Sequence, residues 1–329
     1  MAASQLLLCN SGYSCSLPIS LSRSYQFYKN KETLAFNTKS WPIPKRLILR
    51  NDIVCHAARR KPTFSNAAVS SEGDTVRKVL QTVLWGFEGV YILWLFLLPY
   101  APGDPVWAIS KETVESLIGL SLNFFFILPF INSAGIHFIE APVLHPVSEG
   151  LFNFVIGWTF MFAPLLFTDC KRDRYKGSLD ILWGLQMFLT NTFLIPYMAI
   201  RLNDADSESS PEKRSQLGTV MTNGAAIVGL IGGLACLVSA VWAVYGRMDG
   251  NFGSITERWE FLVSYLGTER LAYAFIWDIG FYTIFQPWLI GENLQNIEKS
   301  KIELVKYLRF VPVVGLVAYL VCLNVEEEL

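Results

Sequence analysis

The sequence LAYAFIWDIGFYTIFQPWLI, residues 271–290, decides the fold class of this chain. Twenty residues with a single charge make a helix of roughly 30 Å, which matches the hydrocarbon core of a bilayer. Aromatic residues stand near both ends, as they do in the interfacial belts of membrane helices. The one charge, Asp278, needs other helices, a partner or a water pocket around it, because an ionised group at this depth is costly. The stretch therefore predicts a membrane span inside a helix bundle.

The composition of the whole chain agrees with a membrane protein. Of its 329 residues, 52% are hydrophobic and only 17% are charged, whereas soluble chains carry about 25% charge. The formal net charge is −1 and the sequence has no block of basic residues, so no nucleic-acid partner is expected. The six cysteines include no CxxC pair, which gives no sign of a zinc or redox site. The expected surroundings are the lipid bilayer and possible membrane-protein subunits, and the sequence indicates no cofactor.

The first seventy residues differ from the rest of the chain. They hold ten Lys or Arg, ten Ser and two acids, Glu32 and Asp52, a composition typical of organelle transit peptides. The start resembles that of chloroplast-targeted proteins, and residues 53–57 resemble a stromal processing site with cleavage after Cys55. We therefore predict a disordered, cleaved chloroplast transit peptide over 1–55, a mobile tail over 56–78 and a helical membrane domain over 79–329. The alternative is an ordinary disordered N-terminus, and the destination stays open between thylakoid and inner envelope.

The hydrophobic pattern predicts an all-α, polytopic bundle with six to seven transmembrane spans. The shortest, 117–131, is the one that makes the count uncertain. Lys and Arg counts favour an N-terminus in the stroma, but this places the basic loop 169–176 on the opposite side unless 117–131 dips in and returns. The topology is therefore left open. The predicted spans are 79–100, 117–131, 151–168, 179–200, 223–245, 271–290 and 308–325.

The span 223–245 is built of small residues. Ala225, Gly229 and Gly233 recur every four positions and lie on one helical face. Such a face lets two backbones approach closely, which promotes helix association in lipid. The pattern predicts close helix packing, either within the bundle or between two protomers.

Two acids lie well inside predicted spans, Glu88 and Asp278. A carboxyl group at membrane depth can load and release a proton or hold a cation, or it can be a static hydrogen-bonded brace between helices. Both interpretations stay open at this stage. The other polar side chains expected to line the interior are Asn123, Asn153, Gln186, Asn191 and Gln286.

One loop contains three residues of metal-ligating types, His137, Glu140 and His145. Pro142 and Pro146 interrupt any helix that would align them. A zinc or iron site needs three or more ligands in fixed geometry. No metal site is therefore predicted, and these three residues are only weak candidates.

Two acidic segments are similar to the motifs with which membrane prenyltransferases hold magnesium and diphosphate. One contains Asp169 and Asp173, and the other contains Asn203, Asp204 and Asp206. The predicted span 179–200 separates them, so we expect the segments to lie on opposite faces of the membrane. In that arrangement they cannot share one metal cluster.

Three classes of function are compatible with these features. The first is a non-enzymatic assembly or scaffold factor, favoured by the small-residue face and by the lack of catalytic motifs. The second is a small-solute or proton- or cation-coupled transporter, favoured by Glu88 and Asp278. The third is a lipid or isoprenoid enzyme, which has the least support.

Overall fold

The computed structural model describes residues 67–204, 213–248 and 250–324. They belong to one of two units into which the chain divides, Pro62–Leu329. Within these ranges the chain forms twelve α-helices and short 3₁₀ and π turns, with no β-strand and one isolated bridge between Ile297 and Leu323. The all-helical class is thus confirmed for the described part. The predicted transit peptide and residues 56–66 of the predicted tail lie outside it.

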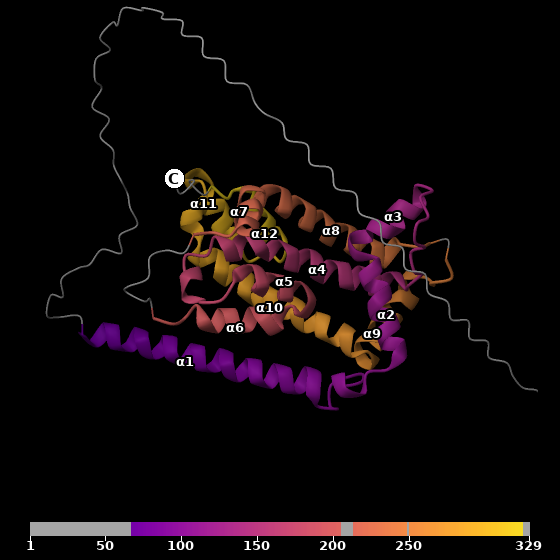
Figure 1. The fold of residues 1–329 in the computed structure, drawn as a ribbon, viewed down its shortest axis with the longest axis horizontal. Helices are drawn as coiled ribbons and strands as arrows, with labels where there is room; N and C mark the ends of the chain where they lie inside the picture. Colours follow the sequence, from indigo (N-terminus) through magenta and orange to yellow (C-terminus); the bar gives the residue numbers. More distant parts are fainter. Residues whose placement is uncertain (1–66, 205–212, 249, 325–329) are drawn as a thin grey trace, which may run out of the picture. The chain divides into compact units, whose positions relative to one another are not determined.

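Helix α4, Pro146–Phe167, is the central element of this unit and is buried along nearly its whole length (Figure 1). Helix α8, Ala225–Tyr245, runs antiparallel to it, and their backbones come close where Gly157 faces Gly232. Helix α10, Arg270–Glu292, runs parallel to α4, with ring contacts along both, for example between Phe152 and Phe275. A helix apolar on all sides is stable here because other helices surround it.

Helix α1, Ala67–Ile92, continues into a π turn, Leu93–Leu97, and lies along the edge of the unit (Figure 1). It runs antiparallel to α10, since the rings of Phe87 and Phe281 meet at 5.1 Å and Arg270 donates to the carbonyl oxygen of Leu98 at 2.9 Å. The opposite face of α1 exposes large apolar side chains. The helix includes residues 67–78, which the sequence had assigned to the mobile tail.

Helices α5, Leu179–Leu189, and α6, Asn191–Ile200, form a hairpin that enters the bundle and returns to the same end. At its base, Arg201 pairs with Asp169, the second residue after α4. At its tip, Thr190 donates to Asp278 in the interior of α10. The sequence predicted one continuous span over 179–200, and this is wrong because the chain reverses at Thr190.

Helices α11, Ile302–Leu308, and α12, Val314–Val321, form a second hairpin of the same kind. Its base is closed by the bridge between Ile297 and Leu323. Near its tip, the carbonyl oxygens of Arg309 and Val311 accept hydrogen bonds from Gln286, farther along α10. Both hairpins therefore begin and end at the same end of the bundle and place their tips on α10.

The remaining helices cover the two ends of the bundle. Helix α7, Gln216–Asn223, packs against the end of α4, where Gly218 faces Phe167. At the other end lie α2, Lys111–Leu122, α3, Ile127–Ser133, and α9, Ile255–Thr268. Helices α2 and α3 are bent by 41°, at a break where Phe125 and Phe126 have positive φ angles.

The two ends of the bundle differ in the number of their Lys and Arg residues. The end at the C-terminus of α4, which we name the basic end, has Arg77, Lys78, Lys171, Arg172, Arg174, Lys176, Arg201, Lys213, Arg214, Lys299 and Lys301. The opposite end, which we name the acidic end, has Asp104, Glu112, Glu115, Glu140, Glu149, Glu257, Glu260 and Glu269. Of the basic residues at the acidic end, Arg258 and Arg270 are buried against backbone carbonyl groups.

The predicted six to seven membrane spans are not confirmed. Three helical segments are long and apolar enough to cross a membrane, namely Gly73–Leu97, Pro146–Phe167 and Ala225–Tyr245, or four if the bent pair α2–α3 counts as one span. The eight residues of α12 reach only about 12 Å. Helix α10 has 23 residues, but its aromatic and polar side chains give it a lower mean hydropathy than the three segments.

The small-residue face of α8 packs within the chain. A Cβ atom added to Gly229 would lie 2.9 Å from the Cβ atom of Leu320, and one added to Gly233 would lie 2.7 Å from Val317, both on α12. Ala225, at the start of the same helix, is buried. Of the two alternatives left by the sequence, these contacts favour packing inside the bundle. The opposite face of α8 exposes large aliphatic side chains.

Candidate functional site

The buried carboxyl group of Asp278 lies where the tip of the α5–α6 hairpin meets α10. Its Oδ1 atom accepts hydrogen bonds from the Thr190 hydroxyl at 2.6 Å, the Asn191 amide at 2.7 Å and the Tyr91 hydroxyl at 3.4 Å. These three donors come from α1 and from the hairpin, and all of them are neutral. One acidic side chain thus joins three helical segments that are far apart in the sequence.

The hairpin tip has an unusual backbone. Thr190 has φ 39° and ψ −109°, a region that β-branched residues rarely adopt. Such a conformation costs roughly 1–3 kcal/mol and persists only where the surroundings hold it. Asp278 supplies that constraint, because it binds the side chains of both Thr190 and the next residue, Asn191. The tip also places the N-terminus of α6 against the carboxyl group, which favours negative charge there.

Several oxygen atoms in this region have no hydrogen-bond partner among the described residues. They are the second carboxyl oxygen of Asp278, Oδ2, the amide oxygen of Asn191, Oδ1, and one carboxyl oxygen of Glu88, Oε2. Asp278 and Asn191 are at most 1% exposed. Buried oxygen acceptors without donors suit a proton or a cation, which would satisfy them and balance the negative charge.

Glu88 lies on α1, one helical turn before Tyr91, and is 5% exposed. Tyr91 lies between the two acids of the predicted interior, because its hydroxyl group donates to Asp278. Both predicted intramembrane acids therefore lie near Tyr91, and of the two only Asp278 accepts a hydrogen bond from it.

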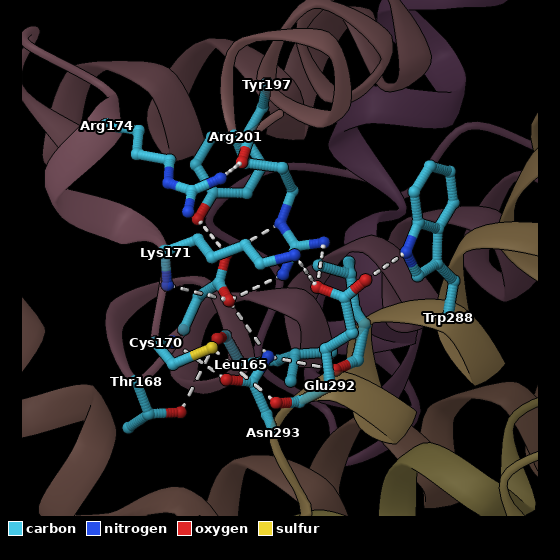
Figure 2. A network of polar contacts seen from close by, with 12 residues as sticks. Leu165, Thr168, Cys170, Lys171, Arg174, Tyr197, Arg201, Trp288, Glu292 and Asn293 are labelled. Carbon is cyan, nitrogen blue, oxygen red and sulfur yellow. Dashed lines mark hydrogen bonds and ion pairs between the residues drawn. The ribbon is translucent and has the colours of Figure 1, made fainter. Parts of the chain in front are cut away.

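The base of the hairpin contains a second buried carboxyl group, Asp169, which has a different environment. Arg201 donates to its two oxygens at 2.9 and 2.7 Å, and Tyr197 and Asn293 add hydrogen bonds at 2.7 and 3.0 Å. Figure 2 shows this network, in which Arg201 also forms an ion pair with Glu292 at 3.1 Å. The network joins the C-terminal ends of α4, α6 and α10.

Charge pairing sets the protonation of these groups. Burial alone raises the pKa of Asp169, but the hydrogen bonds and positive charge of Arg201 outweigh it and leave the pKa below its usual value of 3.8. Burial lowers the pKa of Arg201, and the contacts with Asp169 raise it by more, so its pKa lies above the usual value. Both groups are therefore charged at neutral pH, and the pair is a structural connection rather than a proton donor.

The acidic end has a comparable brace around Glu149, a residue that was not predicted to be part of a site. Its carboxyl group accepts hydrogen bonds from Arg247 at 2.8 Å, from the indole of Trp242 at 2.8 Å and from the Asn123 amide at 2.6 Å. Asn123, predicted as part of a polar interior, is therefore a helix-connecting residue at one end. A weak signal for this brace is present in the sequence, since Glu149 lies in the first turn of the central apolar helix.

The two glutamines predicted to line the interior, Gln186 and Gln286, are buried. Gln286 accepts a hydrogen bond from the Trp158 indole at 3.0 Å and donates two at 2.9 Å to the tip of the α11–α12 hairpin. Gln186 lies on α5, and both polar atoms of its side chain are buried without a hydrogen-bond partner among the described residues. Gln286 therefore holds the tip of the second hairpin much as Asp278 holds the tip of the first.

The weak metal candidates are not brought together. His137 and Glu140 are exposed, whereas His145 caps α4 by accepting the Val147 N–H through Nδ1 at 3.2 Å and stacks on Phe261. Burial lowers the pKa of His145 to about 4, helped by the charge of Arg258 and opposed by that of Glu149. Across the described ranges, no group of three or more His, Cys, Asp or Glu could hold a metal ion.

The two acidic segments lie at the same end of the bundle. The expectation that they lie on opposite faces was wrong, because the hairpin returns its second arm to the first loop, where Arg174 donates to the Arg201 carbonyl oxygen at 2.7 Å. The described acids of these segments are engaged by basic side chains. Asp169 is saturated by Arg201, and Asp204 pairs with Arg77. Asp206 lies outside the described residues.

Comparison of the chain with protein-family models, with curated proteins and with solved structures finds no match. The geometry of the site is therefore the basis on which a function is proposed.

Proposed function

We propose that this chain is a multi-pass membrane protein of the chloroplast. In this arrangement α1, α4, α8 and α10 cross the bilayer, and the hairpins α5–α6 and α11–α12 enter and leave at the basic end. With the bent pair α2–α3, these account for all seven apolar segments in the sequence, only four of which cross. The proposal is supported by the three long apolar segments, by the exposed apolar faces of α1 and α8, and by the transit-peptide composition of the N-terminus.

The charge distribution supports a stromal location for the basic end, because Lys and Arg remain on the side from which a membrane protein inserts. Cys170 is exposed at this end, and Phe138 is 92% exposed beyond the other end of α4. A membrane-impermeant maleimide should label Cys170 and a Phe138→Cys variant from opposite sides of the organelle membrane. Labelling of both from one side would overturn the four-crossing topology. A tagged copy located in plastid sub-fractions would decide between thylakoid and inner envelope.

Within this class, we infer a non-enzymatic assembly or scaffold factor. The observation that supports it is the pair of closed braces, Asp169 with Arg201 and Glu149 with Arg247, which fix the two ends of the helices around α4. A bundle fixed at both ends is a rigid platform, and its outer apolar faces are available to other membrane components. Rigid elements position partners more exactly than loops do.

Co-purification tests the scaffold function directly. The full-length tagged protein, extracted from chloroplast membranes in mild detergent, should carry other membrane subunits at constant stoichiometry. Leu234 is exposed on α8 and Val83 is exposed on α1. Replacing each by Trp should reduce co-purification only for the face that binds a partner. A chain that purifies alone from every membrane fraction would contradict this function.

A second candidate function, small-solute transport coupled to a proton or cation, is favoured by Asp278 at the tip of a re-entrant hairpin. Broken membrane helices that meet near the middle of a bundle form the ion sites of many transporters. An Asp278→Asn variant should lose flux in reconstituted vesicles while still accumulating in the membrane. Under the scaffold function, the same variant keeps its co-purifying partners or fails to accumulate.

A further inference from the structure

We propose that Asp278, Asn191 and the last turn of α5 form a binding site for a monovalent cation of the sodium class. The two side chains are linked, since Asn191 donates to Asp278 at 2.7 Å, and each carries one further oxygen acceptor. Asp278 Oδ2 and Asn191 Oδ1 are both buried and have no partner among the described residues. A bound cation can be coordinated by two oxygen acceptors at the same time.

The break in the hairpin leaves backbone acceptors at the end of α5, next to Thr190. The N–H group of Phe193 bonds to the carbonyl oxygen of Thr190 at 3.3 Å, so α6 begins a new hydrogen-bond ladder after the tip. The last carbonyl groups of α5 are then left without helical N–H partners, as at any helix C-terminus. That end carries the negative pole of the α5 dipole, while the N-terminus of α6 presents a positive pole to the carboxyl group of Asp278. Carboxylate, amide and carbonyl oxygens together suit hard cations.

The charge of the site favours a monovalent ion. Tyr91, Thr190 and Asn191, the side-chain donors to Asp278, are all neutral, so one carboxylate charge is left to balance. Divalent sites are usually built from several acidic ligands. On the outer side, Tyr91 separates Asp278 from an apolar groove of about 330 Å³ between α1 and α10, whose walls include Trp94 and Trp277. The site is thus closed towards the lipid.

This inference deepens the second proposed function and rests on it only for the membrane setting. If the protein binds sodium but transports no solute, the site is supported and the transport function is refuted. If it transports a solute without any response to sodium, the site is refuted. Binding and flux measured on the same preparation therefore separate the two outcomes.

The melting temperature of the purified full-length protein in lipid nanodiscs tests the site. Sodium chloride should raise it by about 3–6 °C at ten times the dissociation constant, relative to choline chloride at equal ionic strength. Radiolabelled sodium should bind at one ion per chain. Asp278→Asn, which keeps the size of the side chain, should abolish both signals. Asp180→Asn is the matched control at the basic end, where Asp180 accepts from Ser215 at 2.5 Å, and it should retain both.

A second variant keeps the test decisive if Asp278→Asn fails to fold. Asn191→Asp adds a carboxylate without changing the volume, so the stabilising ion should change from sodium to calcium. Equal melting temperatures of the wild-type protein in sodium and choline would overturn the proposal. So would a sodium response that survives in Asp278→Asn, or one replaced entirely by a response to pH, which would indicate a proton alone.

Discussion

Asp169 and Asp278 are both buried carboxyl groups that hold the α5–α6 hairpin, one at its base and the other at its tip. Asp169 pairs with Arg201 at 2.7 Å, whereas Asp278 is bound by neutral donors only. The base is therefore fixed by charge neutralisation at the edge of the bundle. The tip lies against Asp278 in the interior of the bundle, and the negative charge of this acid has no positive partner. This difference distinguishes a structural brace from a binding site. A paired charge cannot bind a further ligand, whereas an unpaired charge can.

The largest effect is expected from breaking the brace. Arg201→Met leaves Asp169 buried without its partner, which should cost about 3–5 kcal/mol of unfolding free energy. Thermal unfolding in detergent or nanodiscs measures the loss. The double variant Arg201→Met with Asp169→Asn should recover part of it, because no buried charge is then left unpaired. Equal stability of the single and double variants would show that pairing is not what holds the base.

The next effect concerns the strained tip. Thr190→Val keeps the unfavourable φ angle of 39° but removes the hydroxyl group that donates to Asp278, and should cost roughly 1.5–3 kcal/mol. Thr190→Gly also removes the hydroxyl group, but glycine adopts a positive φ angle without strain. The relief of this strain should restore about 1–3 kcal/mol of unfolding free energy. Val should therefore be the more destabilising replacement in thermal unfolding. If Gly is as damaging as Val, the tip is not strained.

A smaller effect is expected from neutralising the tip itself. Asp278→Asn in choline buffer retains an oxygen that can accept from Thr190 and Asn191, so the cost should be only about 1 kcal/mol. The contrast with Arg201→Met is the sharpest test of the comparison between base and tip. A loss as large as that of Arg201→Met would mean that Asp278 is a brace and not a site.

A separate effect is a dependence of the stability on pH, which involves His145. The pKa of His145 is about 4 in the folded chain against a usual 6.5, so the unfolded state binds more protons between these values. Stability should decline as pH falls from about 6.5 towards 4. His145→Asn keeps a capping acceptor and removes this decline. Asp169, whose pKa is below 3.8, contributes stability that is lost only at lower pH, so Asp169→Asn should leave the decline between 6.5 and 4 unchanged.

The positions of the apolar segments could be predicted from the sequence, but whether each segment runs straight or turns back could not. The stretches 79–100, 151–168 and 223–245 correspond to the three segments that can cross a membrane. The stretch 179–200 is equally apolar but reverses at Thr190, where neither Gly nor Pro marks a turn. The turn depends on Asp278, 88 residues away, and a local pattern does not contain that contact.

The same limit applies to the polar residues. The burial of Glu88, Asp278 and Gln286 was predictable from their depth in apolar stretches, and it is observed. The pairing of Asp169 with Arg201 was not, because both lie in polar segments that the predicted span placed on opposite faces. Once the hairpin returns, the two residues are neighbours, 32 positions apart in the chain.

The sequence by itself determined that this chain is helical, that its segments are apolar enough for lipid, and that a few acids are buried among them. Those properties follow from composition and periodicity, which each segment carries alone. Only the tertiary structure decided which apolar segments form one long helix and which turn back, and which acid has a cationic partner. These outcomes depend on contacts between distant residues, since a helix reverses only where another part of the chain stabilises the turn.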